Sequence, residues 1–542
     1  MHIWQLKPLS KHFALVCLGV AISGFSLNNL VLADSLNSTQ TGFKPAELPD
    51  QFNKSLVTLH KQDFAHLVML RNPDVLITQA QREIAQQQLL SDQGAYEAEF
   101  FATLRASDRQ TKNSNPTFGG DESIPSIPRI IDRSSGFELG VRKLVRSGAE
   151  ITVDYEGRRN SNNMTTSNDP EGFQDATGAL NFSIRQPLLR GFGAAQVEGR
   201  IAQAENQITV AEQEIRQQLL SKTYDALSLY WRLYREEQII NLNTQSLENA
   251  HEIFADTERM VNAGRMPRTA LSEAKSMVVL REAESLAIQQ GYTQVTNAIK
   301  SLLNIPSTEQ QLRFETQSEP DTRRWELPSS FDDYFQSVLI TWPNYAIAQQ
   351  RIAIGQKSLM MAQDELKPRL DLVMGYGQTG RRYQTKSFGG PFNDSFDDDF
   401  PNWNMALEFS MPIGGNQSAR ARQEIALTRI SQNYLQADAV KVELSNQLNT
   451  RLQQVSQAHQ EMQRYAENVQ ILRELLNVER ERFDRGQSRL MDLIDREDKY
   501  NMAVVRLIDA QIRFEMAKVS LQLSDGSLLD EMNIQFDVDV DI

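Results

Sequence analysis

The sharpest chemical pattern in the chain is a pair of aspartates three residues apart, Asp492 and Asp495. On a helix this spacing places both carboxylates on one face, where together they can attract cations. The alternative interpretation is structural, because acidic side chains are favoured at a helix start by the helix dipole. The spacing alone does not choose between a cation-attracting site and an ordinary helix start.

Patterns typical of enzymes are missing from the sequence. Four histidines follow the first 33 residues, and they show no metal-ligand spacing: His60, His66, His251 and His459. The sequence also contains no phosphate-binding loop and no nucleophile-elbow motif. We therefore expect no catalytic residue, no bound metal and no cofactor, and a protein that is not an enzyme.

The first 33 residues are typical of a secretory signal peptide. Lys7 and Lys11 precede an apolar run over 13–27, and small residues lead to an expected cleavage before Asp34. The one cysteine, Cys17, lies inside this segment, so the mature chain is expected to hold no disulfide and no thiolate metal site. Core packing or oligomerisation must then stabilise it.

The chain is acidic. It has 56 Lys and Arg against 70 Asp and Glu, and without the two lysines of the leader the balance is 54 against 70, or −16. This charge argues against nucleic acid as a partner. It fits an acidic, solvated surface or a water-filled passage.

The mature chain repeats itself. Pro73, Ile77 and Gln79 correspond to Pro343, Ile347 and Gln349 at one constant offset. Later positions of the two copies also correspond, such as Gly264 with Gly486. We expect two structural repeats, 34–305 and 330–524, with a linker over 306–329 in the equatorial region and a C-terminal tail over 525–542.

Each repeat contains one very long helix, expected over 195–262 and 418–485. In the second, apolar residues recur every seven positions, namely Leu448, Val455, Met462, Val469 and Leu476. A sustained heptad predicts coiled-coil packing. At 1.5 Å per residue each helix would be about 100 Å long, too long for a compact domain. Shorter helices such as 52–93 and 266–303 would pack end to end along it.

Between the helices the apolar period changes from seven to two. Leu180, Phe182 and Ile184 alternate with polar residues, as do Met405, Leu407 and Phe409, and the segments over 99–105 and 369–374 match them. The pattern is typical of transmembrane β-barrel strands. Two strand pairs cannot close a barrel, so the barrel must be shared between chains. The segment 135–158 predicts either a hairpin outside the membrane, which we favour slightly, or two further barrel strands.

Two Pro/Gly segments connect the strands to the long helices. In the first, Pro187 ends a strand and is followed by Gly191 and Gly193. In the second, Pro412 is followed by Gly414 and Gly415. Proline cannot donate to a strand ladder, and glycine allows the sharp swivel into a helix. Their equivalent positions in the two repeats predict strand-to-helix joints rather than simple surface turns.

These residues resemble the TolC-like outer-membrane efflux proteins. The resemblance rests on the run 186–193, on the aromatic cluster Tyr230-Trp231-Arg232-Leu233 and on the tip glycines Gly264 and Gly486, and it covers about 50–524. It implies a homotrimer with a twelve-stranded barrel in the outer-membrane lipid and a helical tunnel in the periplasm. The implied partners are a periplasmic adaptor protein and an inner-membrane pump.

The resemblance also assigns a periplasmic gate at the second tip. There an aromatic, a glycine and two acidic residues constrict the tunnel of the family, and Phe483, Gly486, Asp492 and Asp495 match them. This chain departs from the family at Ser488, where an arginine that helps to close the tip is common. The departure leaves open how this tip is held closed.

The fold class that we predict is an α+β membrane channel, a trimeric transmembrane β-barrel continued by a long periplasmic α-helical coiled-coil barrel, with an internal two-fold repeat. The predicted function is that of an outer-membrane exit duct of a tripartite efflux or type I secretion system. The alternative is a periplasmic coiled-coil adaptor or scaffold protein without a pore. The sequence does not name the cargo.

Overall fold

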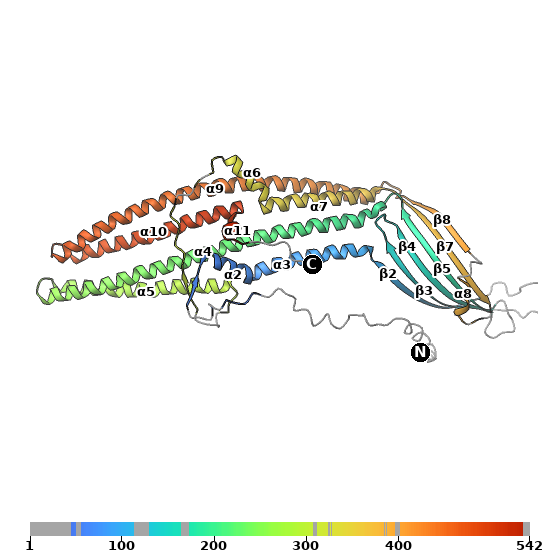
Figure 1. The fold of residues 1–542 in the computed structure, drawn as a ribbon, viewed down its shortest axis with the longest axis horizontal. Helices are drawn as coiled ribbons and strands as arrows, with labels where there is room; N and C mark the ends of the chain where they lie inside the picture. Colours follow the sequence, from blue (N-terminus) through green and yellow to red (C-terminus); the bar gives the residue numbers. More distant parts are fainter. Residues whose placement is uncertain are drawn as a thin grey trace, which may run out of the picture. The chain divides into compact units, whose positions relative to one another are not determined.

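The structure is a computed structural model of the chain (Figure 1). It describes residues 45–49, 52, 56–112, 129–163, 173–306, 312–323, 326, 328–383, 385, 387–395 and 401–534. The expected signal peptide lies outside these residues. Contacts divide the chain after Ala46, and all the elements below belong to the unit 47–542.

Two helices of 68 residues each dominate this unit, α4 (Ala195–Asn262) and α9 (Gln417–Asp484). Each folds back on a shorter helix, α4 on α5 (Arg268–Leu302) and α9 on α10 (Leu490–Asp525). The heptad residues Leu448, Val455 and Met462 are buried, as the coiled-coil prediction requires.

The turns at the ends of the two long helices have the same backbone hydrogen bonds. Gly264 and Gly486 adopt φ of +73° and +70°, and each closes the last helical turn in a Schellman arrangement. The N–H of Arg265 donates to Met260 O, and that of Gln487 donates to Arg482 O, both at 2.8 Å. Glycine at these positions avoids the strain that a Cβ meets in the left-handed region.

Shorter helices pack against the middle and the strand-side parts of the long helices. They are α2 (Lys61–Arg71), α3 (Pro73–Gln93), α6 (Phe331–Thr341), α7 (Pro343–Leu366) and α11 (Leu528–Glu531). The expected single helix over 52–93 is wrong, since the chain breaks at Asn72, where Pro73 cannot donate and begins a new helix. Helix α7 contacts both α4 and α9.

The largest core cluster lies around the middle of α4. Tyr230 and Trp231 are fully buried there, with their rings edge to face at 5.3 Å, so the aromatic cluster is packing core. Beside it, β1 (Leu56–Leu59) pairs in parallel with β6 (Arg313–Thr316), which lies in the expected linker. Sequence analysis did not predict this small sheet.

The remaining strands form one antiparallel sheet in the order β2-β3-β4-β5-β7-β8 (Figure 1). Their bounds are β2 (Ala98–Lys112), β3 (Arg129–Leu144), β4 (Glu150–Asn162), β5 (Phe173–Pro187), β7 (Arg369–Tyr383) and β8 (Pro401–Ser410). A short helix, α8 (Gly389–Asp394), precedes β8. The segment 135–158, for which we slightly favoured a hairpin outside the membrane, lies within this sheet, because β3 and β4 are inserted between β2 and β5. Among the described residues the sheet has six strands, where each chain of a twelve-stranded trimer would supply four.

The two faces of the sheet differ in chemistry. One row of paired residues crosses all six strands on the apolar face, and its side chains are 42–77% exposed: Phe100, Val141, Val153, Phe182, Tyr376 and Trp403. The opposite face carries ion pairs such as Glu99 with Arg142 and Arg105 with Glu138. The predicted alternation of apolar and polar residues thus extends to the inserted strands.

Candidate functional site

The first joint connects β5 to α4 through a backbone that only glycine adopts easily. Gly191 and Gly193 have φ of +85° and +66°, and Ala194 follows at +49°. Pro187 is the last residue of β5 that pairs with β7. Beyond it the Leu188 N–H still donates to Leu370 O at 2.8 Å and the Arg190 N–H to Pro368 O at 3.3 Å. The structure thus places the three residues predicted for this joint at one swivel.

A buried carboxylate holds this swivel. The Gly191 N–H donates to Asp364 Oδ2 at 2.8 Å, and Asp364 is only 3% exposed. Lys367 pairs with the other oxygen of the same carboxylate at 3.0 Å. Asp364 lies near the end of α7, so the second repeat positions the joint of the first. Sequence analysis missed this residue, and nothing in the local pattern distinguishes it from other helix carboxylates.

The turn between β3 and β4 packs against the same joint and accepts hydrogen bonds from it. The Gly193 N–H donates to Ser147 O at 2.9 Å, and the Gln186 side chain donates to that oxygen at 3.0 Å. Gly148 has φ of +85°, and a Cβ there would lie 2.4 Å from Gly191 O. The inserted hairpin is therefore interlocked with the joint through its turn.

The second joint, between β8 and α9, has similar backbone angles and few contacts. Gly414, Gly415 and Asn416 have φ of +107°, +90° and +49°. Pro412 and both glycines are exposed, and Ile413 is fully so. The Asn416 side chain donates to Glu365 O at 3.1 Å. Because Glu365 follows Asp364, the end of α7 brings the two joints together.

Charged residues form a network on the polar face of the sheet, just beyond the first joint. Arg185 on β5 lies 3.2 Å from Asp371 on β7 and 2.6 Å from Glu408 on β8. Arg369 also contacts the Asp371 carboxylate, at 2.8 Å. These contacts fix the register of three strands at the end where they enter the helices.

At the second tip the structure separates the four predicted gate residues. Asp492 and Asp495 line a hollow together with Gly486, and the same hollow is lined by Arg482, Arg489 and Arg496. Phe483, in contrast, is buried in the apolar cluster between the helices and does not line the hollow.

The carboxylates at this tip are close to cations of their own chain. Asp492 lies in the first turn of α10, and Asp495 pairs with Lys499 at 2.6 Å. Ser488, the departure from the family, donates its hydroxyl to Glu479, which is nearly buried. Sequence analysis missed Glu479 as a partner that ties the tip turn to α9.

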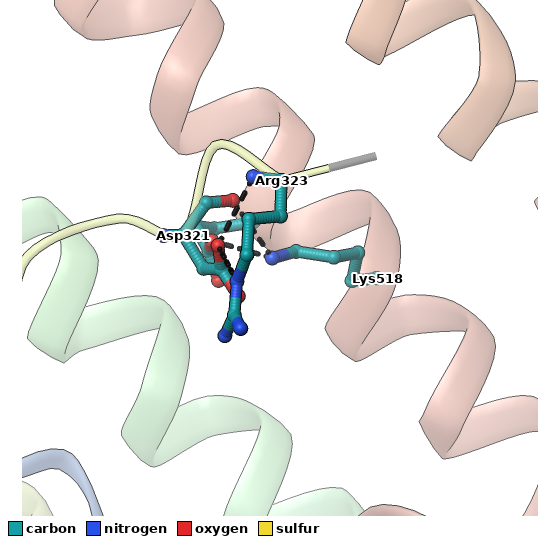
Figure 2. A network of polar contacts seen from close by, with 4 residues as sticks. Asp321, Arg323 and Lys518 are labelled. Atoms are coloured by element: carbon teal, nitrogen blue, oxygen red, sulfur yellow. Dashed lines mark hydrogen bonds and ion pairs between the residues drawn. The ribbon is translucent and has the colours of Figure 1, made fainter. Parts of the chain in front are cut away.

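The linker between the repeats is anchored at two points. Figure 2 shows Asp321 with Arg323 and Lys518; the Lys518 ammonium donates to Asp321 O at 3.1 Å, and the Arg323 guanidinium donates to the Asp321 carboxylate. The Arg323 contact lowers the pKa of Asp321. At the other point the Thr316 N–H donates to Glu237 on α4 at 3.0 Å, and burial raises the pKa of Glu237 to about 7.

The described residues contain no group of three or more His, Cys, Asp or Glu placed to hold a metal ion. Within the same residues no helix is long and apolar enough to cross a membrane.

An antiparallel sheet with one apolar face is thus joined through Pro/Gly swivels to two long helical hairpins. Residues 335–527 match the family model described as "Outer membrane efflux protein". The chain is also similar to "Outer membrane efflux protein BepC" of Brucella suis biovar 1 (strain 1330), with 19% identity over 376 residues, 69% of this chain and 78% of the relative.

Solved structures share the fold. A membrane protein from Pseudomonas aeruginosa matches with a TM-score of 0.63 and 15% identity, over 86% of this chain and 93% of that one. The CmeC outer membrane channel of Campylobacter jejuni matches with a TM-score of 0.63 and 12% identity, over 86% of each chain. Together these matches confirm the resemblance to the TolC-like outer-membrane efflux proteins.

Proposed function

We propose that the protein is the outer-membrane exit duct of a tripartite efflux or type I secretion system. It passes solutes from the periplasm or a pump to the exterior and catalyses no reaction. The sheet lies in the outer membrane and the helices extend into the periplasm, where an adaptor and an inner-membrane pump engage them. The family match and the channel folds favour this function over that of an adaptor or scaffold without a pore.

One observation carries the proposal: the sheet exposes a continuous apolar face and ends in two edge strands, β2 and β8. Lipid can cover the face, but it cannot satisfy the backbone groups of a sheet edge. Joining β8 of one chain to β2 of the next in a ring of three satisfies both. We therefore propose a homotrimer whose barrel is shared between chains.

The repeats and their boundaries support the same assembly. Helices α4 and α9 have equal lengths, and their tip turns are closed by the same bonds. We propose that 34–305 and 330–524 are the two repeats, joined by the linker 306–329 and followed by the tail 525–542. Six repeats in a trimer would then surround the tunnel with pseudo-sixfold symmetry.

The assembly is tested by membrane fractionation and by mass determination in mild detergent. We expect the protein in the outer-membrane fraction and three chains in each particle. A monomer stably inserted in the membrane would contradict the shared barrel. Recovery in the soluble periplasmic fraction would favour the adaptor alternative.

We propose further that Asp492 and Asp495 form a cation-sensitive constriction at the periplasmic tip, where threefold symmetry gathers six carboxylates. Changing both to Ala should weaken cation selectivity and block by trivalent cations in planar bilayers, with trimer formation intact. The nearby arginines and Lys499 reduce the net negative charge, so we expect a severalfold change in selectivity rather than its loss.

A matched control is the double alanine variant of Glu481 and Asp484, which lie at the same tip but do not line the hollow. It should keep the selectivity of the unaltered protein. If the Asp492/Asp495 variant also keeps it, the two aspartates are helix-start residues and the constriction lies elsewhere.

A further inference from the structure

Strands β3 and β4 occupy the middle of the sheet rather than its margin. The full length of β2, Ala98–Lys112, pairs with β3, and β4 pairs with β5 from Glu150–Arg185 to Asn162–Phe173. In the described part of the chain β2 has no ladder contact with β5. A hairpin in this position cannot leave the sheet without separating β2 from the other strands.

The apolar face is continuous across the inserted strands. Val141 and Val153 continue the row that joins Phe100 to Phe182 and Trp403. The next row along adds Ile151 between Lys143 and Ile184. An exposed apolar band of this kind needs lipid or protein to cover it. If β3 and β4 were in water, the lipid-facing surfaces of β2 and β5 would be separated by a solvated gap.

Aromatic rings packed over glycines fix the register of the inserted strands. A Cβ on Gly157 would lie 2.6 Å from the ring of Phe137, and one on Gly140 would lie 2.6 Å from the ring of Phe101. Each ring therefore lies over the glycine of a neighbouring strand, which is a recognised way to hold barrel strands in register. Residues on both faces of the sheet take part.

The opposite face of the hairpin is polar and charged, as expected of a surface in contact with water. Arg142 pairs with Glu99 at 2.8 Å, and Arg105 with Glu138 at 3.0 Å, and these side chains remain partly or largely exposed. Asn181 on β5 donates to Asp154 on β4 at 2.8 Å. Lipid on one side and water on the other is the environment of a barrel wall.

We infer that β3 and β4 are two further strands of the transmembrane barrel, so that the trimer encloses an eighteen-stranded exit that admits solutes too wide for a twelve-stranded one. The inference rests on the proposed trimeric duct. With strands about 4.8 Å apart and tilted by about 40°, eighteen strands give a backbone diameter of roughly 36 Å, against roughly 24 Å for twelve. The inserted hairpin therefore sets the size limit of the exit for bulky cargo.

Labelling of engineered cysteines tests where the hairpin lies. In a Cys17→Ser background the chain has no other cysteine. Val153→Cys and Thr152→Cys place thiols on the two faces of β4, and Phe182→Cys and Ser183→Cys do the same at the paired positions of β5. In intact outer membranes, a membrane-impermeant maleimide should label the Thr152 and Ser183 variants at least tenfold faster than the other two.

The outcomes separate the inference from the proposed function. If the Val153 variant labels as fast as the Thr152 variant while the Phe182 variant stays protected, the hairpin lies outside the lipid. The inference is then overturned and the duct is retained. If the Phe182 variant labels fast as well, the sheet is not in a membrane and the proposed function fails with it.

Strand number and width are tested directly. Electron cryo-microscopy of the full chain in nanodiscs should show eighteen membrane strands, and twelve would overturn the inference. Polyethylene glycols of graded size, added on the exterior side of a bilayer, should enter the barrel and lower its conductance. Deleting 129–163 should reduce the largest polymer radius admitted by about a third, following the strand number. An unchanged limit would overturn the inference, and if the deletion does not assemble, the strand count decides.

Discussion

The two strand-to-helix joints have similar backbone angles and very different surroundings. The first receives hydrogen bonds or close packing from α7, from β7 and from the turn at Ser147. The second has one side-chain bond, from Asn416, and an isoleucine that is fully exposed. The Pro/Gly pattern therefore determines the backbone conformation of both joints, but it does not determine how closely each joint is packed.

The difference follows from the place of each joint in the sheet. The first leaves an inner strand, β5, whose neighbours on both sides belong to the same chain. The second leaves the edge strand β8, whose outer neighbour must come from another chain if the barrel closes. The first joint therefore has all its packing partners within one chain, whereas the second joint gains partners only in the proposed trimer. Substitutions in each joint, or in a segment packed against it, test this difference.

The largest effect is expected at Gly148. Gly148→Ala places a Cβ against Gly191 O in a left-handed backbone, so we expect a loss of about 3 kcal/mol in stability and a low yield of trimer. Gly414 also has a positive φ, but a Cβ there would meet open space. Gly414→Ala should therefore cost only the backbone strain, about 1 kcal/mol. Denaturant unfolding of the purified protein measures both. Equal losses would show that a neighbouring chain packs on the second joint as closely as β3 and β4 pack on the first.

A smaller effect is expected from the polar contacts of the joints. Asp364→Ala leaves the Gly191 N–H without its acceptor and should cost about 2 kcal/mol, whereas Asn416→Ala removes one part-buried neutral bond and should cost about 1 kcal/mol. Asp364→Asn keeps an acceptor and should fall between them. The same unfolding measurement applies, and a larger loss at Asn416 would contradict the view that the first joint is the better supported.

The smallest effect is expected from pH. It tests whether the contact between Glu237 and Thr316 anchors α4 to the linker. Burial raises the pKa of Glu237 to about 7, so the folded state binds this proton more tightly than the unfolded state. The resulting stabilisation is full below about 4.5 and is lost as pH rises through 7. Between pH 8 and 6 we expect stability to increase by at most about 1 kcal/mol.

Glu237→Gln should flatten this dependence of the unfolding midpoint on pH. Glu319→Gln, which removes an exposed carboxylate of the same linker that does not contribute to the raised pKa of Glu237, should leave it unchanged. If both variants behave alike, the contact between Glu237 and Thr316 does not couple the linker to α4.

Local patterns predicted most of the elements but few of their contacts. The heptads of α9 and the alternation around Phe182 identify a long helix and a strand, because each period is visible within a short stretch of sequence. Asp364, Ser147 and Glu479 were missed because their partners lie elsewhere in the chain. Phe483 was assigned to the gate by resemblance, yet its ring is buried between helices, since an apolar side chain at a helix end packs wherever the partner helix offers a core.

The amino-acid sequence alone predicts the two long helices, the alternating strands, the swivels at Pro187 and Pro412, and the resemblance to outer-membrane efflux proteins. These features depend on periodicity and on residue-specific φ values, which are local. The place of β3 and β4 in the sheet follows instead from contacts between distant parts of the chain. Alternation predicts a strand but not its neighbours, because strand order depends on hydrogen bonds between residues far apart in the chain, such as Ala98 with Lys143.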